Sequence, residues 1–215
     1  MIKTKKDLNF YIAADRIMNG YPKDKKIKDY FKESFIFGGS NTLIIKYLYY
    51  MRKYAYRRNN HSRLFSINSI FMLWNHYWFT KYAVKCGFSI GYNSLGYGVV
   101  IPHYGTIVVN EDCAVGHFAV LHTCTCIAGG GKIIGDGLYL STGSQIVGEL
   151  QITDGVTIAS HSLVNKSITE KNVLVAGAPA TVRRTGYSTW YSNPNGKFHS
   201  RIDLVNKLIH NYTNV

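Results

Sequence analysis

The sequence predicts a mainly β protein, a parallel β-helix with α-helices before it and a short helix after it. Apolar residues first recur at helical spacing, then every six residues, and return to helical spacing over residues 199–212. These changes predict a helical N-terminal domain over 1–87, a β-helix domain over 88–185 and a C-terminal extension with a helix over 186–215.

The six-residue repeat predicts about four triangular coils. Ten aliphatic residues each open a six-residue unit, with a short insertion at GGGKI (129–133): Val109, Val115, Leu121, Ile127, Ile134, Leu140, Ile146, Ile152, Ile158 and Val164. The fifth place of most units is small or β-branched: Cys113, Ala119, Thr125, Ser144, Val156 and Ser162. Three units make one coil, the aliphatic side chains point into the prism, and stacked coils pair their backbones.

Two helices are predicted in the N-terminal part, one over 43–58 and one over about 64–85. The most apolar window, 64–79, is interrupted by polar residues and is shorter than the ~20 residues that a membrane span requires. We therefore expect a buried or membrane-surface helix there.

The charge is concentrated at the front of the chain. Of the net charge of +13, residues 1–87 carry +12. Because no RRM or KH signature is visible, we expect no nucleic-acid partner. An anionic membrane surface, an acidic glycan or a merely solvated Lys-rich surface remain open. The N-terminus has no apolar stretch typical of a signal peptide, which predicts a cytoplasmic protein with four free thiols, Cys86, Cys113, Cys124 and Cys126.

Three motifs carry a family resemblance: AADRIMNG at 13–20, IPHYGTIVVNEDCAVG at 101–116 and AGAPA at 176–180. Together they resemble the serine O-acetyltransferases among the hexapeptide-repeat acetyltransferases. They are closer still to the related enzymes of capsule and exopolysaccharide gene clusters. The resemblance implies a left-handed β-helix, a homotrimer with active sites between neighbouring prisms, and acetyl-CoA as the acetyl donor.

His103 is the candidate catalytic base. It matches the family's base, which removes the proton of an acceptor hydroxyl while acetyl leaves the CoA thioester, and histidine changes protonation near neutral pH. Phe88 and Pro102 stand where serine O-acetyltransferases have acidic residues. Asp15, Glu111 or a backbone carbonyl could therefore orient His103.

The resemblance also implies binding residues. Register places the contacts to the pantetheine arm at Gly129, Thr142 and Ser160, and glycine at Gly129 and Gly130 lets backbone amides approach the thioester oxygen. The predicted phosphate contacts are Arg183 and Arg184. The predicted acceptor contacts are Asp15, Tyr104 and His122.

The acceptor is predicted to be a sugar hydroxyl of a surface polysaccharide or its precursor, with L-serine as the alternative. Serine O-acetyltransferases read the serine with an Arg-His pair in a long loop, which here is reduced to about 129–133 without either residue. An amino-acid carboxylate usually calls for such a cation.

Two other functions compete. His117 and His122 have a spacing that resembles the zinc ligands of γ-class carbonic anhydrases, and His103 could be a third ligand. Other motifs of that family are absent, so we expect no metal. A β-helix serving only as a scaffold is the non-enzymatic alternative.

Overall fold

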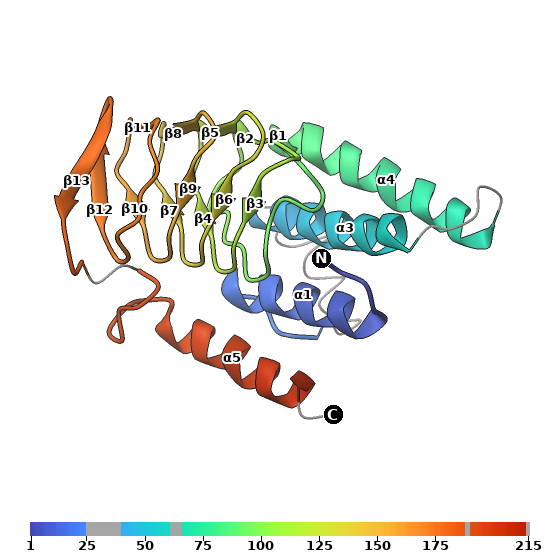
Figure 1. The fold of residues 1–215 in the computed structure, drawn as a ribbon. Coiled ribbons are helices and arrows are strands. Elements are labelled where there is room, and N and C mark those ends of the chain that lie inside the picture. The colour runs from blue at the N-terminus through green and yellow to red at the C-terminus, as the bar shows by residue number, and fades with distance from the viewer. Residues whose placement is uncertain (25–39, 61–65, 188–189, 214–215) are drawn as a thin grey trace.

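The computed structural model describes residues 1–24, 40–60, 66–187 and 190–213 and consists of a β-helix with α-helices at one end and along one side (Figure 1). The helices are α1 (Lys5–Met18), α3 (Ser40–Asn59), α4 (Ile67–Cys86) and α5 (His199–Thr213). The strands are β1 (Phe88–Ile90), β2 (Ile107–Val109), β3 (Ala114–Val115), β4 (Val120–Leu121), β5 (Thr125–Ala128), β6 (Ile133–Ile134), β7 (Tyr139–Leu140), β8 (Gln145–Val147), β9 (Gln151–Ile152), β10 (Thr157–Ile158), β11 (Leu163–Val164), β12 (Leu174–Gly177) and β13 (Ala180–Arg184).

The helix boundaries follow local capping chemistry. Thr4 precedes α1, and its hydroxyl accepts a hydrogen bond from the Asp7 amide while the Asp7 carboxylate accepts one from the Thr4 amide. Ser66 and Ser69 form the corresponding pair at the start of α4. Gly87 ends α4 with a φ of 78°, a left-handed conformation that glycine adopts at little cost. The β-helix begins directly after it.

The strands form the three faces of a parallel β-helix, which confirms the predicted fold class. The first face is the sheet β1-β2-β5-β8-β11, the second is β3-β6-β9, and the third is β4-β7-β10-β12, to which β13 adds in the antiparallel direction. Single bridges extend the second and third faces, at Leu95–Val115, Ile152–Ile168 and Val100–Val120.

Residues 88–175, all of them described, make about five coils, so the prediction of about four was one coil short. The additional coil comes first, with Ile90, Leu95 and Val100 on its three faces. Their spacing is five residues, and a search for a strict six-residue repeat therefore misses them.

The core of the prism is the predicted one. All ten aliphatic residues of the repeat are at most 5% exposed. The small residues at the fifth places, from Cys113 to Ser162, are at most 3% exposed. The repeat therefore follows the inward-facing positions coil by coil.

The helices share apolar clusters with the prism. Ile44, Leu48 and Met51 of α3 belong to the same buried cluster as the aliphatic residues of the coils. The terminal helix α5, predicted over 199–212, packs with α1 against the third face through Ile202 and Val205. The first and last helices, α1 and α5, thus lie side by side along the prism (Figure 1).

The apolar window at 64–79 behaves differently from a core helix. Residues 64–65 lie outside the described part of the chain, and α4 covers 67–79. Most of its large apolar side chains are exposed, which rules out the buried alternative, and the membrane-surface alternative stays a prediction. None of the helices in the described residues is long and apolar enough to cross a membrane.

Replacing Ile146 by valine is expected to lower the free energy of unfolding by about 0.5–1.5 kcal/mol, because a fully buried methyl group is lost from the prism. Ile133 precedes an inward position but is 60% exposed, so Ile133→Val should change stability little. Urea unfolding of both variants measures the difference. Equal losses would contradict the assignment of inward and outward positions.

Candidate active site

One edge of the prism gathers five of the predicted site residues. This edge, called the histidine corner below, joins the third face to the first and comprises residues 102–106, 122–124, 141–143 and 159–161. Its segments are stacked: the Gly143 amide donates to the Thr123 carbonyl at 3.1 Å, and the His161 amide to the Thr142 carbonyl at 3.0 Å. The predicted residues at this corner are His103, Tyr104, His122, Thr142 and Ser160.

The remaining loop residues lie at another edge. Glu111, Gly129 and Gly130 belong to the turns that join the first face to the second. Glu111 is exposed, and its carbonyl accepts a bond from the Ser94 hydroxyl at 3.3 Å. Among the described residues, its carboxylate makes no hydrogen bond to His103. One prism therefore does not bring the two groups of predicted residues together.

His103 is exposed at the histidine corner, next to His122 of the following coil. Burial lowers the pKa of His122, and the nearby His103 lowers it further. The Nε2 atom of His122 lies 2.8 Å from the Tyr139 hydroxyl, which ties the ring to the third face. The His122 ring beside the candidate base is therefore harder to protonate than a free imidazole.

A groove opens beside His103, between the first coil and the two terminal helices. Met18, Asn19 and Tyr21 line one side, and Lys197, Phe198 and Arg201 line the other. The Arg201 guanidinium donates to the Met18 carbonyl at 2.8 Å and lies over the Phe198 ring. Cations thus share the groove with the candidate base, which the sequence did not reveal because they are more than ninety residues away from it.

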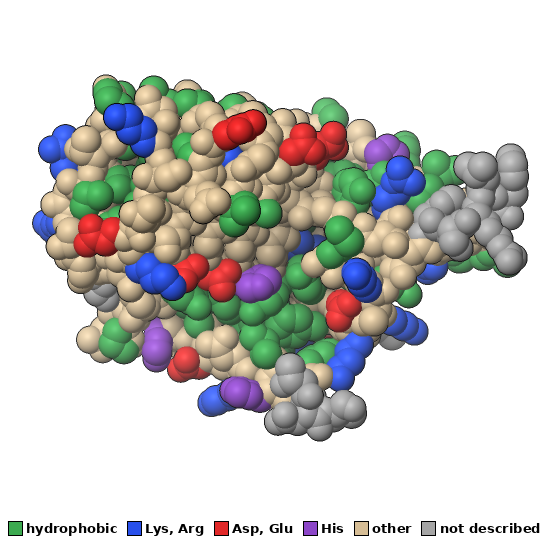
Figure 2. Space-filling model, in the orientation of Figure 1, with side chains coloured by type: hydrophobic (Ala, Val, Ile, Leu, Met, Phe, Trp, Pro, Cys, Tyr) green, Lys and Arg blue, Asp and Glu red, His purple; other side chains and the backbone are tan. Residues whose placement is uncertain are grey.

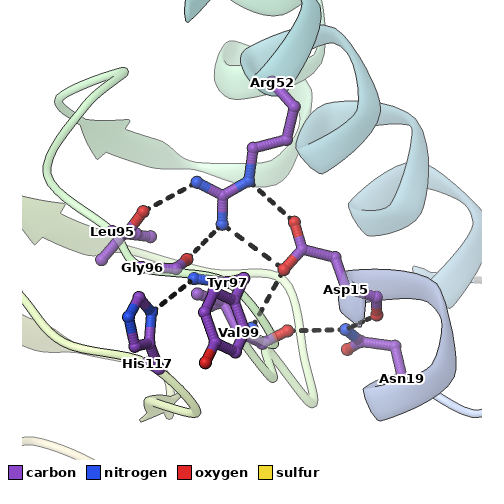
Figure 3. A network of polar contacts seen from close by, with 8 residues as sticks. All are labelled: Asp15, Asn19, Arg52, Leu95, Gly96, Tyr97, Val99 and His117. Carbon is purple, nitrogen blue, oxygen red and sulfur yellow. Dashed lines mark hydrogen bonds and ion pairs between the residues drawn. The ribbon is translucent and has the colours of Figure 1, made fainter. Parts of the chain in front are cut away.

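Asp15 of the AADRIMNG motif lies in a buried network at the first coil (Figure 3). Its carboxylate accepts hydrogen bonds from the Arg52 Nε at 2.8 Å and from the Val99 amide at 3.1 Å. Arg52 also donates to the carbonyls of Leu95 and Gly96. Asp15 was predicted to orient His103 or to bind the acceptor, but within the described residues its carboxylate has no contact with His103.

Asn19 of the same motif holds the backbone that leads to His103 (Figure 3). Its side-chain amide donates to the Val99 carbonyl at 2.7 Å, and its oxygen accepts from the Ile101 amide at 3.4 Å. The first coil has no preceding coil, so these side chains occupy backbone groups that a neighbouring strand would otherwise satisfy. Asp15, Asn19 and Arg52 are thus positioning residues for the segment that ends at His103.

Lys132 holds the turn that carries the predicted CoA contacts Gly129 and Gly130, and sequence reasoning missed it. Its side chain is 1% exposed, and its ammonium group donates to the carbonyls of Ala128 and Gly129. The Cys113 thiol also lies 3.2 Å from the Gly129 carbonyl. These contacts point the carbonyls inward and fix the turn at Gly129–Gly130, where amides were predicted to face the thioester.

Arg183 and Arg184 lie on β13, at the far end of the prism from His103. Both side chains are exposed. Their predicted contact with CoA phosphates stays a prediction.

The two histidines of the zinc alternative flank β4 and have separate partners. The Nδ1 atom of His117 accepts the Tyr97 amide at 3.2 Å, and its ring stacks on Tyr97 with centroids 3.7 Å apart. His122 is held by Tyr139 at the other end of the strand. No group of three or more His, Cys, Asp or Glu suited to a metal ion is found in the described part of the chain.

All four cysteines are free thiols, as predicted. Burial raises the pKa of Cys86 to about 11, and Cys124 is exposed.

Stability is expected to fall as the pH drops below about 6.5, because burial lowers the pKa of both His117 and His122 from that ordinary value. The unfolded chain then binds more protons than the folded one, so acid favours unfolding. Urea unfolding between pH 7 and pH 5 measures the slope, and His122→Gln should reduce it. An unchanged slope in that variant would contradict the assignment.

Comparison with known proteins points to one group of enzymes. No family model matches the chain. The serine acetyltransferase of Staphylococcus epidermidis is 26% identical over 99 residues, which cover 43% of this chain and 46% of that protein. The matched part of the chain thus spans about half the length of the curated relatives.

Two solved structures have a similar fold. Neisseria gonorrhoeae serine acetyltransferase in complex with serine has a TM-score of 0.57 at 20% identity and covers 84% of this chain and 70% of that one. A serine acetyltransferase in complex with CoA has a TM-score of 0.55 at 18% identity. The match covers 80% of this chain and 67% of that one. The chain is therefore serine acetyltransferase-like in fold and in part of its sequence.

Proposed function

We propose that the chain is an acetyl-CoA-dependent O-acetyltransferase whose catalytic base is His103. The observation that carries the proposal is the position of His103, exposed at the corner of a β-helix and at the edge of a groove that also contains Lys197 and Arg201. The likeness to serine acetyltransferases supports the same reaction.

In the proposed reaction, the His103 imidazole accepts the proton of the acceptor hydroxyl as the oxygen attacks the thioester carbonyl. The acetyl group forms an ester with that oxygen, and the CoA thiolate leaves and takes up a proton. No covalent intermediate on the protein is needed.

The residues proposed to hold acetyl-CoA divide between two edges of the prism. Thr142 and Ser160 are exposed at the histidine corner, whereas Gly129 and Gly130 lie at the edge between the first two faces. A neighbouring prism would bring the second group to the first, and this supports the proposal of a homotrimer with active sites between subunits. The proposed location is the cytoplasm, where acetyl-CoA is available.

L-serine is the acceptor that the comparisons favour, and it replaces the sugar as our leading proposal. The turn at 129–133 lacks the Arg-His pair that binds the serine carboxylate in that family. Lys197 and Arg201 now supply cations in the groove of His103, from the C-terminal segment instead. A sugar hydroxyl of a surface polysaccharide or its precursor is the second candidate, because the short turn at 129–133 lacks the residues that read serine in that family.

The test is release of free CoA from acetyl-CoA by the purified chain, with L-serine, neutral sugars and uronic acids as acceptors. We expect turnover with serine and a rise in KM for it in Lys197→Gln, because a cation facing the carboxylate is lost. Turnover only with sugars would transfer the proposal to the second candidate. Absence of turnover with every acceptor, together with absence of CoA binding by calorimetry, would favour the scaffold alternative.

A further inference from the structure

The outer face of α4 is the largest exposed apolar feature of the described residues. Seven large apolar side chains of this one helix are between 48% and 77% exposed. They recur at spacings of three, four and seven and therefore lie on one side of the helix. They are Ile67, Ile70, Phe71, Leu73, Trp74, Tyr77 and Val84.

The opposite side of α4 explains why this face is left free. That side packs on α3 and the first coil, where the Phe79 ring contacts Tyr47 and Tyr54 and where Cys86 is buried. The helix thus already has its intramolecular partner, and it extends away from the prism alongside α3 (Figure 1). Contiguous exposed apolar surface of this kind marks an interaction site in a soluble protein.

The segment that carries this face is basic. The sequence has no Asp or Glu between Glu33 and Glu111. Residues 40–86 hold eight Lys and Arg residues, of which Arg52 is neutralised by Asp15. In Figure 2, hydrophobic side chains and a basic one lie side by side over α4 at the upper right.

Some of these cations are held directly beside the apolar face. The Lys81 ammonium lies 4.6 Å from the centre of the Trp78 ring. The Arg57 guanidinium lies 5.2 Å from the centre of the Phe71 ring, and its Nη1 donates to the Asn68 side chain at 2.6 Å. An apolar strip with Trp and Tyr, bordered by cations, is the pattern of a helix that lies in a membrane interface.

We infer that the outer face of α4 rests on an anionic lipid bilayer, with the helix parallel to the surface. The apolar side chains enter the boundary between headgroups and acyl chains, and the Lys and Arg side chains contact the anionic headgroups. This binding is separate from acetyl transfer and does not depend on the proposed function.

Charge argues against a second copy of the chain as the occupant. A twofold contact sets the same patch against itself. It would bring two basic surfaces together, whereas an anionic bilayer supplies the opposite charge.

The experiment is flotation of the full chain with vesicles. One set contains phosphatidylglycerol and phosphatidylethanolamine, and the other contains phosphatidylcholine alone. We expect flotation with the anionic set and loss of it at 1 M salt, where the screening length falls to about 3 Å. Quenching of tryptophan fluorescence by brominated acyl chains should accompany binding of the unmodified chain, since Trp74 then lies at the interface.

The variant Leu73→Ser/Trp74→Ser should lower the vesicle partition constant at least about tenfold, because burial of one large apolar side chain already corresponds to that ratio or more. Leu204→Ser is the matched control, since Leu204 is 53% exposed on α5 and should not affect binding. Failure of the unmodified chain to float with anionic vesicles would overturn the inference. So would equal flotation with both vesicle sets, or a change of oligomeric state in the double variant without any vesicle binding.

Discussion

His103→Ala is expected to lower the rate of acetyl-CoA turnover by a factor of about 10²–10⁴, the usual contribution of a general base. Without the imidazole, the acceptor hydroxyl keeps its proton while it attacks the thioester. The side chain is exposed and, among the described residues, makes no hydrogen bond that holds the fold. The variant should therefore unfold at the same urea concentration as the unmodified chain.

CoA release at saturating acceptor measures the effect on kcat, and His76→Ala is the matched control, since His76 is an exposed histidine on α4. We expect the control to keep full activity. A loss of less than threefold in His103→Ala would show that another group takes the proton. His122 would then be the first to test, because it is the neighbouring imidazole.

Asp15→Ala is expected to lower the free energy of unfolding by about 3–5 kcal/mol, because it leaves the Arg52 guanidinium buried without its counter-charge. The two side chains are at most 3% exposed, so water cannot replace the lost carboxylate. The Val99 amide loses its acceptor in the same substitution. Both losses fall on the first coil, immediately before His103.

Lys171→Met is the matched control, since the Asp154–Lys171 pair has a similar distance but lies on the surface. An exposed pair contributes little, and this variant should remain close to the unmodified chain. The double variant Asp15→Ala/Arg52→Met should recover part of the loss, because the unpaired charge is removed with its partner. Equal urea midpoints for Asp15→Ala and Lys171→Met would contradict a buried network.

The prism could be predicted because its geometry is local. One aliphatic residue every six places is sufficient to assign the inward positions. The ten aliphatic residues of the repeat are all buried, as expected. The first coil was not predicted because its inward residues are five places apart instead of six. For residues 64–79 the sequence left a buried and a membrane-surface helix open, because a helix rich in Trp, Phe and Leu fits either position until the packing of its neighbours is known.

The candidate site was less predictable because its contacts are distant in sequence. Arg52 is 37 residues from Asp15, and Val99 is 84 residues from it. No spacing rule connects such positions. The groove beside His103 also depends on where α5 packs, so Lys197 and Arg201 could not be assigned to it from the sequence.

The two ends of the prism have a consequence for assembly. A stack of coils is a template that could grow without limit, since each end offers unpaired strands to another molecule. At one end, Asp15, Asn19 and Arg52 form hydrogen bonds with backbone groups between Leu95 and Ile101. At the other, β13 returns antiparallel over β12 and turns Arg183 and Arg184 outward. We therefore expect these contacts to hinder end-to-end polymerisation, and loss of either closure to favour fibrous aggregates over discrete particles.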